Sequence, residues 1–146
     1  MAASPQQLAE AMGVFASHLI RCGSPDLIQF LGDVDLSITQ VKMLMLLEDM
    51  GELSVKDVAT ALNLSLPATS RAIDGLAQRG LVDRRESETD RRVKIISLRP
   101  GGRQIGAALI ASRQATYVGF AADLPEDERN ALHAALLPIV ERIRRS

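Results

Sequence analysis

The sequence predicts a mainly α-helical fold that carries one charged β-hairpin, and three observations support this prediction. Apolar residues recur at helical spacing over most of the chain. Near its centre, two short helical segments meet at a tight joint. Directly after them, the stretch ESETDRRVKIISL (86–98) crowds charges around a turn and continues as a β-branched run, which is typical of a strand. With 146 residues, the chain is long enough for one domain with a real core.

The N-terminal part is predicted to form two amphipathic helices. The first covers residues 5–21, and the sequence CGSPD (22–26) should end it, because glycine and proline interrupt helices. The second covers residues 36–50, where Ser37 or Thr39 can act as the N-cap.

Two short helices are predicted next, at residues 54–64 and 65–80. The first opens with Ser54 and Asp57, a pattern like a capping box, and the second has Ser65 as its expected N-cap. The apolar face of the second helix contains Leu66, Ile73, Leu76 and Ala77. Its polar face contains Pro67, Ser70, Arg71, Asp74 and Gln78. Two short helices with a tight joint, the second with a small and polar N-terminal half, are typical of a helix-turn-helix.

The remaining elements are a hairpin and two helices. Residues 81–85 and 93–98 are strand-like, and the charged turn between them makes a hairpin. A long helix is expected at about residues 102–122, and a last one at residues 125–145. Pro138 lies in the last helix and removes one backbone hydrogen bond, so a kink or a split is expected there.

The charge of the chain is unevenly distributed. The net charge is −1, but residues 71–103 contain nine basic and five acidic residues, so this segment carries +4 and the remainder −5. Fourteen of the seventeen basic residues are arginine, whose planar guanidinium suits phosphate groups and guanine edges. A local basic excess of this kind can bind a polyanion although the whole chain is nearly neutral.

Other features argue against several classes of protein. No apolar run approaches the roughly 18 residues of a membrane helix, and the N-terminus lacks the pattern of a secretory signal. The single cysteine, Cys22, cannot form an internal disulfide, which fits a reducing cytoplasm. There is no glycine-rich phosphate loop, nucleophile elbow or metalloprotease pair, so an enzyme is the weakest class, and no metal or cofactor is expected.

The order of the elements predicts binding to double-stranded DNA. In a helix-turn-helix that is followed by a wing, the second helix enters the major groove and the wing reaches over the backbone. Arg91 and Arg92 at the tip of the wing could enter the adjacent minor groove, where the potential is most negative. Asp90 would then pair with a neighbouring arginine and fix its direction.

The run SLPATSRAIDGLAQRGLVDRRESETDRRVKIISL (65–98) resembles the recognition helix and wing of the MarR family of winged-helix regulators. In that family the stretch reads S-x-x-T/S-R-x-hydrophobic-D-x-L-x-x-x-G-L-V-x-R, followed by a turn ending in D-R-R and a strand. The matching residues are Ser70, Arg71, Ile73, Asp74, Leu76, Gly80, Leu81, Val82, Arg84, Asp90, Arg91 and Arg92. One departure is LRPGG (98–102), where the family usually has L-T-x-x-G, so the long helix is expected to start later or to fray.

The resemblance implies a winged helix-turn-helix with six helices, a two-stranded β wing and a dimerisation region. The whole chain, residues 1–146, would form a single winged-helix domain. Residues 36–99 would be its DNA-binding lobe, and residues 1–24 and 102–146 would supply the dimerisation helices.

The resemblance also implies which residues bind DNA and which line an effector pocket. Those expected to bind DNA are Ser65, Pro67, Thr69, Ser70, Arg71, Arg84, Arg85, Asp90, Arg91 and Arg92. Among them Asp90 would orient Arg92, which would enter the minor groove, while Arg91 meets phosphate. Arg84 and Arg85 would support the wing or touch the DNA backbone. Effector pockets in the family lie between the dimer region and the DNA-reading lobe. The candidates there, chosen by position, are His18, Arg21, Met43 and Tyr117.

The function that follows from the resemblance is that of a homodimeric repressor of a pseudo-palindromic operator, released by a small-molecule effector. Two alternatives stay open: a winged-helix module whose wing binds an acidic protein, and a redox sensor that acts through Cys22. The features themselves also have simpler explanations. The polar helix face could be solvated, the arginines could only blunt a sheet edge, and Cys22 could be a structural thiol.

Overall fold

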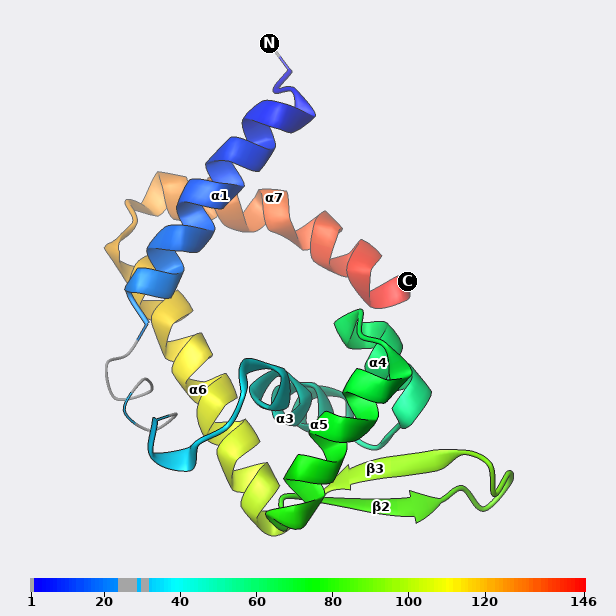
Figure 1. Cartoon of the computed structure of the whole chain (residues 1–146). Coiled ribbons are helices and arrows are strands. Elements are labelled where there is room, and N and C mark those ends of the chain that lie inside the picture. Colours follow the sequence, from blue (N-terminus) through cyan, green and yellow to red (C-terminus); the bar gives the residue numbers. More distant parts are fainter. Residues whose placement is uncertain (1, 24–28, 30–31) are drawn as a thin grey trace. The chain divides into compact units, whose positions relative to one another are not determined.

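The computed structural model describes residues 2–23, 29 and 32–146, which belong to two compact units (Figure 1). One unit combines residues 1–23 with residues 113–146, and the other covers residues 24–112. The division falls inside the long helix α6 (Pro100–Asp123). The sequence placed the change from DNA-binding lobe to dimerisation helices earlier, just before this helix.

The first unit is built from α1 (Pro5–Arg21), the C-terminal part of α6 and α7 (Glu126–Arg145). The rings of Phe15 and Phe120 meet edge to face, with centroids 5.0 Å apart, and the ring of His18 lies 5.9 Å from the same Phe120 ring. No residue of α1 or α7 is buried. This unit therefore leaves much apolar surface open to solvent.

The helix α7 runs without interruption through Pro138, so the split considered from the sequence is wrong. Its charges favour one continuous helix. The three acidic residues of the first turn and the three arginines of the last turn both complement the helix dipole. The predicted break after the first helix lies partly outside the described residues, because residues 24–26 are not among them.

The second unit packs α3 (Ile38–Met50), α4 (Val55–Leu62) and α5 (Leu66–Gln78) around one core. Ser37, and not Thr39, is the N-cap of α3, and it forms a full capping box with Gln40. The core residues come from all three helices and from two strands. They are Met43, Leu44, Leu47, Val58, Ile73, Leu76, Val82 and Ile96.

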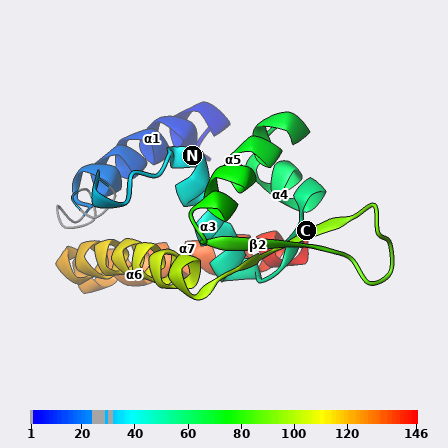
Figure 2. The same cartoon turned by 60° about the horizontal axis from the view of Figure 1, so that its bottom comes forward.

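The wing belongs to a three-stranded antiparallel sheet, whereas the sequence predicted two strands. β2 (Val82–Glu86) and β3 (Lys94–Leu98) form the predicted hairpin, and β1 (Leu53–Ser54) pairs with the other edge of β3. Two residues are too few to show an alternating pattern, which explains why β1 was missed. Figure 2 shows the hairpin extending past α4 and α5.

A glycine ends α5 and sets the direction of the wing. Gly80 has a φ of 69°, and its N–H donates to the Ala77 carbonyl at 3.0 Å. The N–H of Leu81 donates to the Leu76 carbonyl, also at 3.0 Å. This pair of bonds is a Schellman motif, which requires a left-handed residue that glycine adopts without strain. Strand β2 starts two residues after this glycine.

The long helix α6 begins at Pro100, so the expected late start is wrong. Pro100 stands at the first position of the helix, where its fixed φ is favourable. Two residues later the chain approaches closely at Gly102, which is buried. A Cβ atom there would lie 2.0 Å from the Leu81 carbonyl oxygen, so only glycine fits. The helix is thereby seated against the chain that enters β2. None of the described helices is long and apolar enough to span a membrane.

Candidate nucleic-acid interface

The N-terminal end of α5 is held by its own side chains. The hydroxyl oxygen of Ser65 accepts a hydrogen bond from the Ala68 N–H at 3.2 Å, so this residue caps the helix. Pro67 follows in the first turn, where a missing N–H breaks no helical hydrogen bond. Pro67 and Arg71 are exposed and Ser70 is half-buried. The end of the helix is thus rigid and carries accessible groups.

Thr69 is not part of this accessible face, which corrects the prediction that it faces DNA. Its side chain is 0% exposed, and its hydroxyl donates to the Ser65 carbonyl at 2.8 Å. The helical period explains the error. Thr69 lies four residues before Ile73 and seven before Leu76, so it points into the core on the same stripe.

Leu66 was predicted to be buried but is exposed. Its period along the helix assigned it to the apolar face, yet it is 54% exposed. Leu66 is the first residue of α5, and the first turn extends beyond the part of the helix that packs on the core. An apolar side chain therefore stands on the accessible end of the helix.

The tip of the wing is ordered by Asp90. Its side-chain oxygen Oδ1 accepts a hydrogen bond from the backbone N–H of Arg92 at 3.0 Å, and its carbonyl accepts the N–H of Val93 at 3.0 Å. The hairpin is closed by the Ser87 N–H, which donates to the Val93 carbonyl at 2.9 Å. The sequence suggested that Asp90 pairs with an arginine side chain. Its observed contact is with the main chain that carries the arginine.

Four ion pairs hold the body of the wing. Arg84 reaches Asp74 of α5 at 2.9 Å, and Arg85 reaches Glu52, just before β1, at 2.6 Å. The other two pairs are Lys94 with Glu86 at 3.0 Å and Arg99 with Asp83 at 3.2 Å. All eight side chains are at least one-third exposed, so each pair contributes little to stability. They do fix where Arg84 and Arg85 point, which is toward carboxylates of their own chain.

Other cations are left free by this arrangement. Within residues 2–23, 29 and 32–146, no carboxylate pairs with Lys56, Arg71, Arg91 or Arg92. All four are exposed. Sequence reasoning missed Lys56, because it stands outside the helix and wing motifs. An unpaired exposed cation can bind an external anion without first losing an internal partner.

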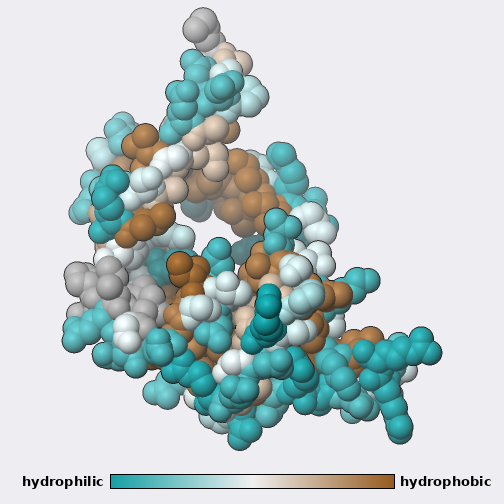
Figure 3. All heavy atoms as spheres, viewed as in Figure 1, coloured by the Kyte–Doolittle hydropathy of each residue, from teal (hydrophilic) through white to brown (hydrophobic). Residues whose placement is uncertain are grey.

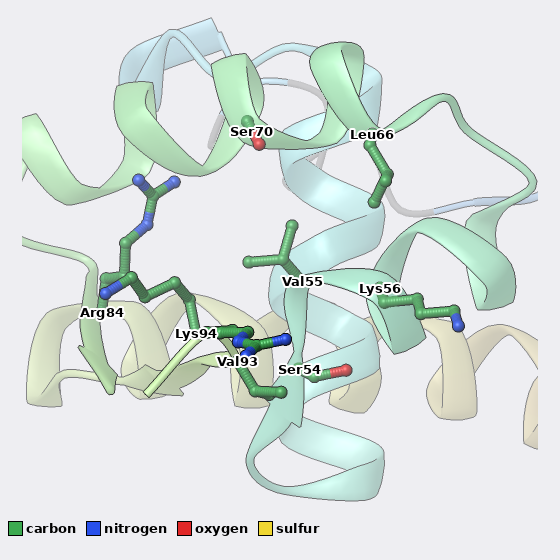
Figure 4. A pocket seen from close by; sticks show the side chains of 9 residues that line it. Ser54, Val55, Lys56, Leu66, Ser70, Arg84, Val93 and Lys94 are labelled. Atoms are coloured by element: carbon green, nitrogen blue, oxygen red, sulfur yellow. The ribbon is translucent and has the colours of Figure 1, made fainter. Parts of the chain in front are cut away.

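A cavity of about 410 Å³ lies between the N-terminal ends of α4 and α5 and the wing (Figure 4). Its apolar lining comes from Val55, Leu66 and Val93. Its cations are Lys56, Arg84, Arg92 and Lys94, and Ser54 and Ser70 add hydroxyl groups. Figure 4 shows Leu66 and Val55 extending from the starts of their two helices into the same space. The site therefore combines an apolar lining with positive charge.

The four effector candidates lie in different surroundings. Met43 is fully buried in the core of the second unit. The other three belong to the first unit, where His18 lines a cavity of about 430 Å³ and Arg21 lines a different one. Tyr117 is 45% exposed on α6. His18 and Arg21 thus line two separate cavities, and neither Met43 nor Tyr117 lines either of these two.

Cys22 contacts a histidine of helix α1. Its Sγ atom lies 3.4 Å from Nε2 of His18, one helical turn earlier, and both residues line the same cavity. The spacing of four residues at the end of a predicted helix is the signal that points to this contact. Among the described residues, no three His, Cys, Asp or Glu side chains gather as metal ligands.

These features define a class of protein. A helix-turn-helix with an accessible second helix, followed by a wing with unpaired arginines at its tip, is a winged-helix DNA-binding fold. The MarR family model matches residues 36–94, the segment that contains the helix-turn-helix and most of the wing. The HTH-type transcriptional regulator YfiV of Bacillus subtilis is 33% identical over 112 residues, which cover 73% of this chain and 70% of that protein. The chain belongs to the MarR family of transcriptional regulators, as its resemblance predicted.

Two solved structures show the same fold. FabT of Streptococcus pneumoniae, solved in complex with DNA, superposes with a TM-score of 0.74 at 19% identity, over 97% of this chain and 98% of that one. BpsR of Bordetella bronchiseptica, whose DNA binding is regulated by 6-hydroxynicotinic acid, superposes with a TM-score of 0.63 at 22% identity, over 92% and 98% of the two chains. At these identities the likeness establishes the fold alone.

Proposed function

We propose that this MarR-family regulator is a cytoplasmic homodimeric repressor that binds a pseudo-palindromic DNA operator and is released by a small-molecule effector. The DNA part rests on three exposed cations of α5 and the wing that have no carboxylate partner in the described part of the chain, Arg71, Arg91 and Arg92. In the proposed complex α5 enters the major groove and Ser70 and Arg71 meet base edges. Arg92 enters the minor groove and Arg91 meets phosphate.

The ion pairs of the wing refine the roles of two predicted residues. Arg84 and Arg85 already hold carboxylates of their own chain, at 2.9 Å and 2.6 Å. A second anion would have to share them or displace those partners. We therefore assign Arg84 and Arg85 to the support of the wing, and Arg91 and Arg92 to the DNA.

The dimer is supported by the apolar surface of the first unit. Figure 3 shows hydrophobic residues gathered along α7. On α7 the exposed large hydrophobic residues are Leu132, Leu136, Leu137, Ile139, Val140 and Ile143. On α1 they are Leu8, Met12, Val14, Phe15 and Ile20. Exposed apolar surface on two whole helices is unusual for a monomer and fits a second copy of the chain.

Repression and release follow from the geometry of such a dimer. Two recognition helices related by a two-fold axis fit major grooves about one helical turn, roughly 34–36 Å, apart. A small molecule that binds better to a dimer with another spacing shifts the population away from the DNA-binding state. The DNA complex of FabT and the regulation of BpsR by 6-hydroxynicotinic acid are the examples from related structures that support this mechanism.

The test begins with fluorescence anisotropy on DNA from immediately upstream of the protein's own gene, at two salt concentrations, against a random duplex of equal length. A selection from a random duplex library supplies the operator if that DNA does not contain it. Nanomolar and salt-sensitive binding that outcompetes the random duplex supports the proposal. Equal and weak binding to every duplex, including the selected pool, would contradict it and favour a protein partner. Light scattering measures the oligomeric state in the same samples, and a monomer would contradict the dimer.

A further inference from the structure

The exposed Leu66 is the feature that the proposed contacts leave unexplained. It is the first residue of α5 and is 54% exposed, although Ile73 and Leu76 of the same predicted face are buried. The N-terminal residues of a recognition helix are the ones that reach base edges. An apolar side chain there gains nothing from phosphates. Its position therefore suggests contact with an apolar group of the DNA.

Leu66 lines a cavity that has both apolar and positively charged side chains. Val55 and Val93 line the same cavity as Leu66 (Figure 4). Two other lining residues, Lys56 and Arg92, are cations without a carboxylate partner among the described residues. A neutral apolar ligand would form no ion pair with either of these two cations. The combination fits a polyanion that offers an apolar projection between phosphate groups.

Duplex DNA has one such projection in the major groove, the 5-methyl group of thymine. We propose that Leu66 is a specificity-determining residue that contacts a thymine methyl group in each operator half-site, while Lys56 contacts a neighbouring phosphate and Arg92 keeps its place in the adjacent minor groove. This inference rests on the proposed function. It adds a direct reading of one base type, and it adds Leu66 and Lys56 to the residues that bind DNA.

The test replaces single thymines of the operator with deoxyuridine, which removes the methyl group and changes nothing else on the base. The transfer free energy of one methyl group corresponds to about a fourfold loss of affinity. We expect such a loss for wild type at one thymine per half-site. In Leu66→Ala, the unsubstituted operator should bind several-fold more weakly, and the same deoxyuridine substitution should then have almost no effect.

A matched control is Ile38→Ala. Ile38 is the first residue of α3, is 76% exposed and is not among the residues that line the cavity. This variant should keep the wild-type response to deoxyuridine. Lys56→Ala should weaken binding to all duplexes alike, because a phosphate contact carries no sequence information.

The possible failures can be told apart. If wild type shows no preference for any duplex, the proposed function itself fails. If wild type binds its operator tightly but no deoxyuridine substitution weakens it, the methyl contact is refuted while the regulator stands. If Leu66→Ala retains the full response to deoxyuridine, another residue reads the methyl group and the assignment to Leu66 is wrong. Thermal unfolding of each variant shows whether the fold is intact, and an exposed leucine should be dispensable for it.

Discussion

Arg84 of strand β2 and Asp74 of helix α5 form an ion pair of 2.9 Å that ties the wing to the proposed recognition helix. Asp74 lies three residues after Arg71 and eight before the start of β2, so the pair closes a short loop of chain. A carboxylate beside DNA phosphates is unfavourable by itself. Its pairing with Arg84 removes that cost and holds the two DNA-reading elements in one relative orientation.

This relationship predicts unequal effects of the two single substitutions. Arg84→Met should weaken operator binding more than Asp74→Asn, because only the first leaves an unpaired carboxylate at the interface. The double variant should resemble Asp74→Asn. Unfolding free energies should change by less than about 1 kcal/mol, since both side chains are at least one-third exposed. Anisotropy and urea unfolding measure the two quantities, and equal losses from both single variants would contradict the assignment.

Arg92→Ala should weaken binding to every duplex and flatten its salt dependence. A cation that enters the minor groove displaces counterions, so its loss should lower the slope of log K against log salt by about 0.9, as the loss of one phosphate contact does. Arg144→Ala in the last turn of α7 is the control, and it should leave the slope unchanged. An unchanged slope in Arg92→Ala would remove this residue from the interface.

Arg71→Ala should behave differently, because a side chain at base edges carries sequence information. We expect a loss of about 1–3 kcal/mol on the operator and a relaxed preference at one base pair per half-site. Selection from a random library with wild type and variant measures the preference. Identical selected sites would indicate that Arg71 contacts phosphate only.

Thr69→Val tests the corrected orientation of the recognition helix. The valine has nearly the same shape and is buried, and only the hydrogen bond to the Ser65 carbonyl is lost. Stability should fall by about 1 kcal/mol, and the operator preference should not change. A variant with altered base preference would show that Thr69 reaches DNA after all.

Gly102→Ala should be strongly destabilising, whereas Gly101→Ala should not. A Cβ at position 102 would lie 2.0 Å from the Leu81 carbonyl oxygen, but at position 101 its nearest contact is a Leu81 side-chain carbon at 3.5 Å. We expect a loss of about 3 kcal/mol for the first variant and a change of at most about 1 kcal/mol, in the stabilising direction, for the second. Urea unfolding of the pair measures both, and similar stabilities would refute the close approach.

Much of the fold was predictable because its signals are local. The period of apolar residues predicted the helices, and Ser37, Ser54 and Ser65 were each identified as possible N-caps. The charged turn predicted the hairpin. In contrast, β1 has two residues and exists only because β3 offers it a partner. The pairing of two strands that are distant in the sequence produces no periodic pattern of apolar residues in a segment as short as β1.

The sequence by itself determined the class of protein, the order of its helices and the hairpin, since capping, periodicity and turn chemistry act within a few residues of the chain. Only the tertiary structure decided which side chains of those elements are accessible for contact with DNA. It buried Thr69, exposed Leu66 and paired Arg84 with Asp74, while Lys56 and Arg92 have no carboxylate partner among the described residues. The physical reason is that burial and ion pairing depend on neighbours from other elements. Those neighbours are set by how the helices pack and where the sheet lies, which a helical period does not encode.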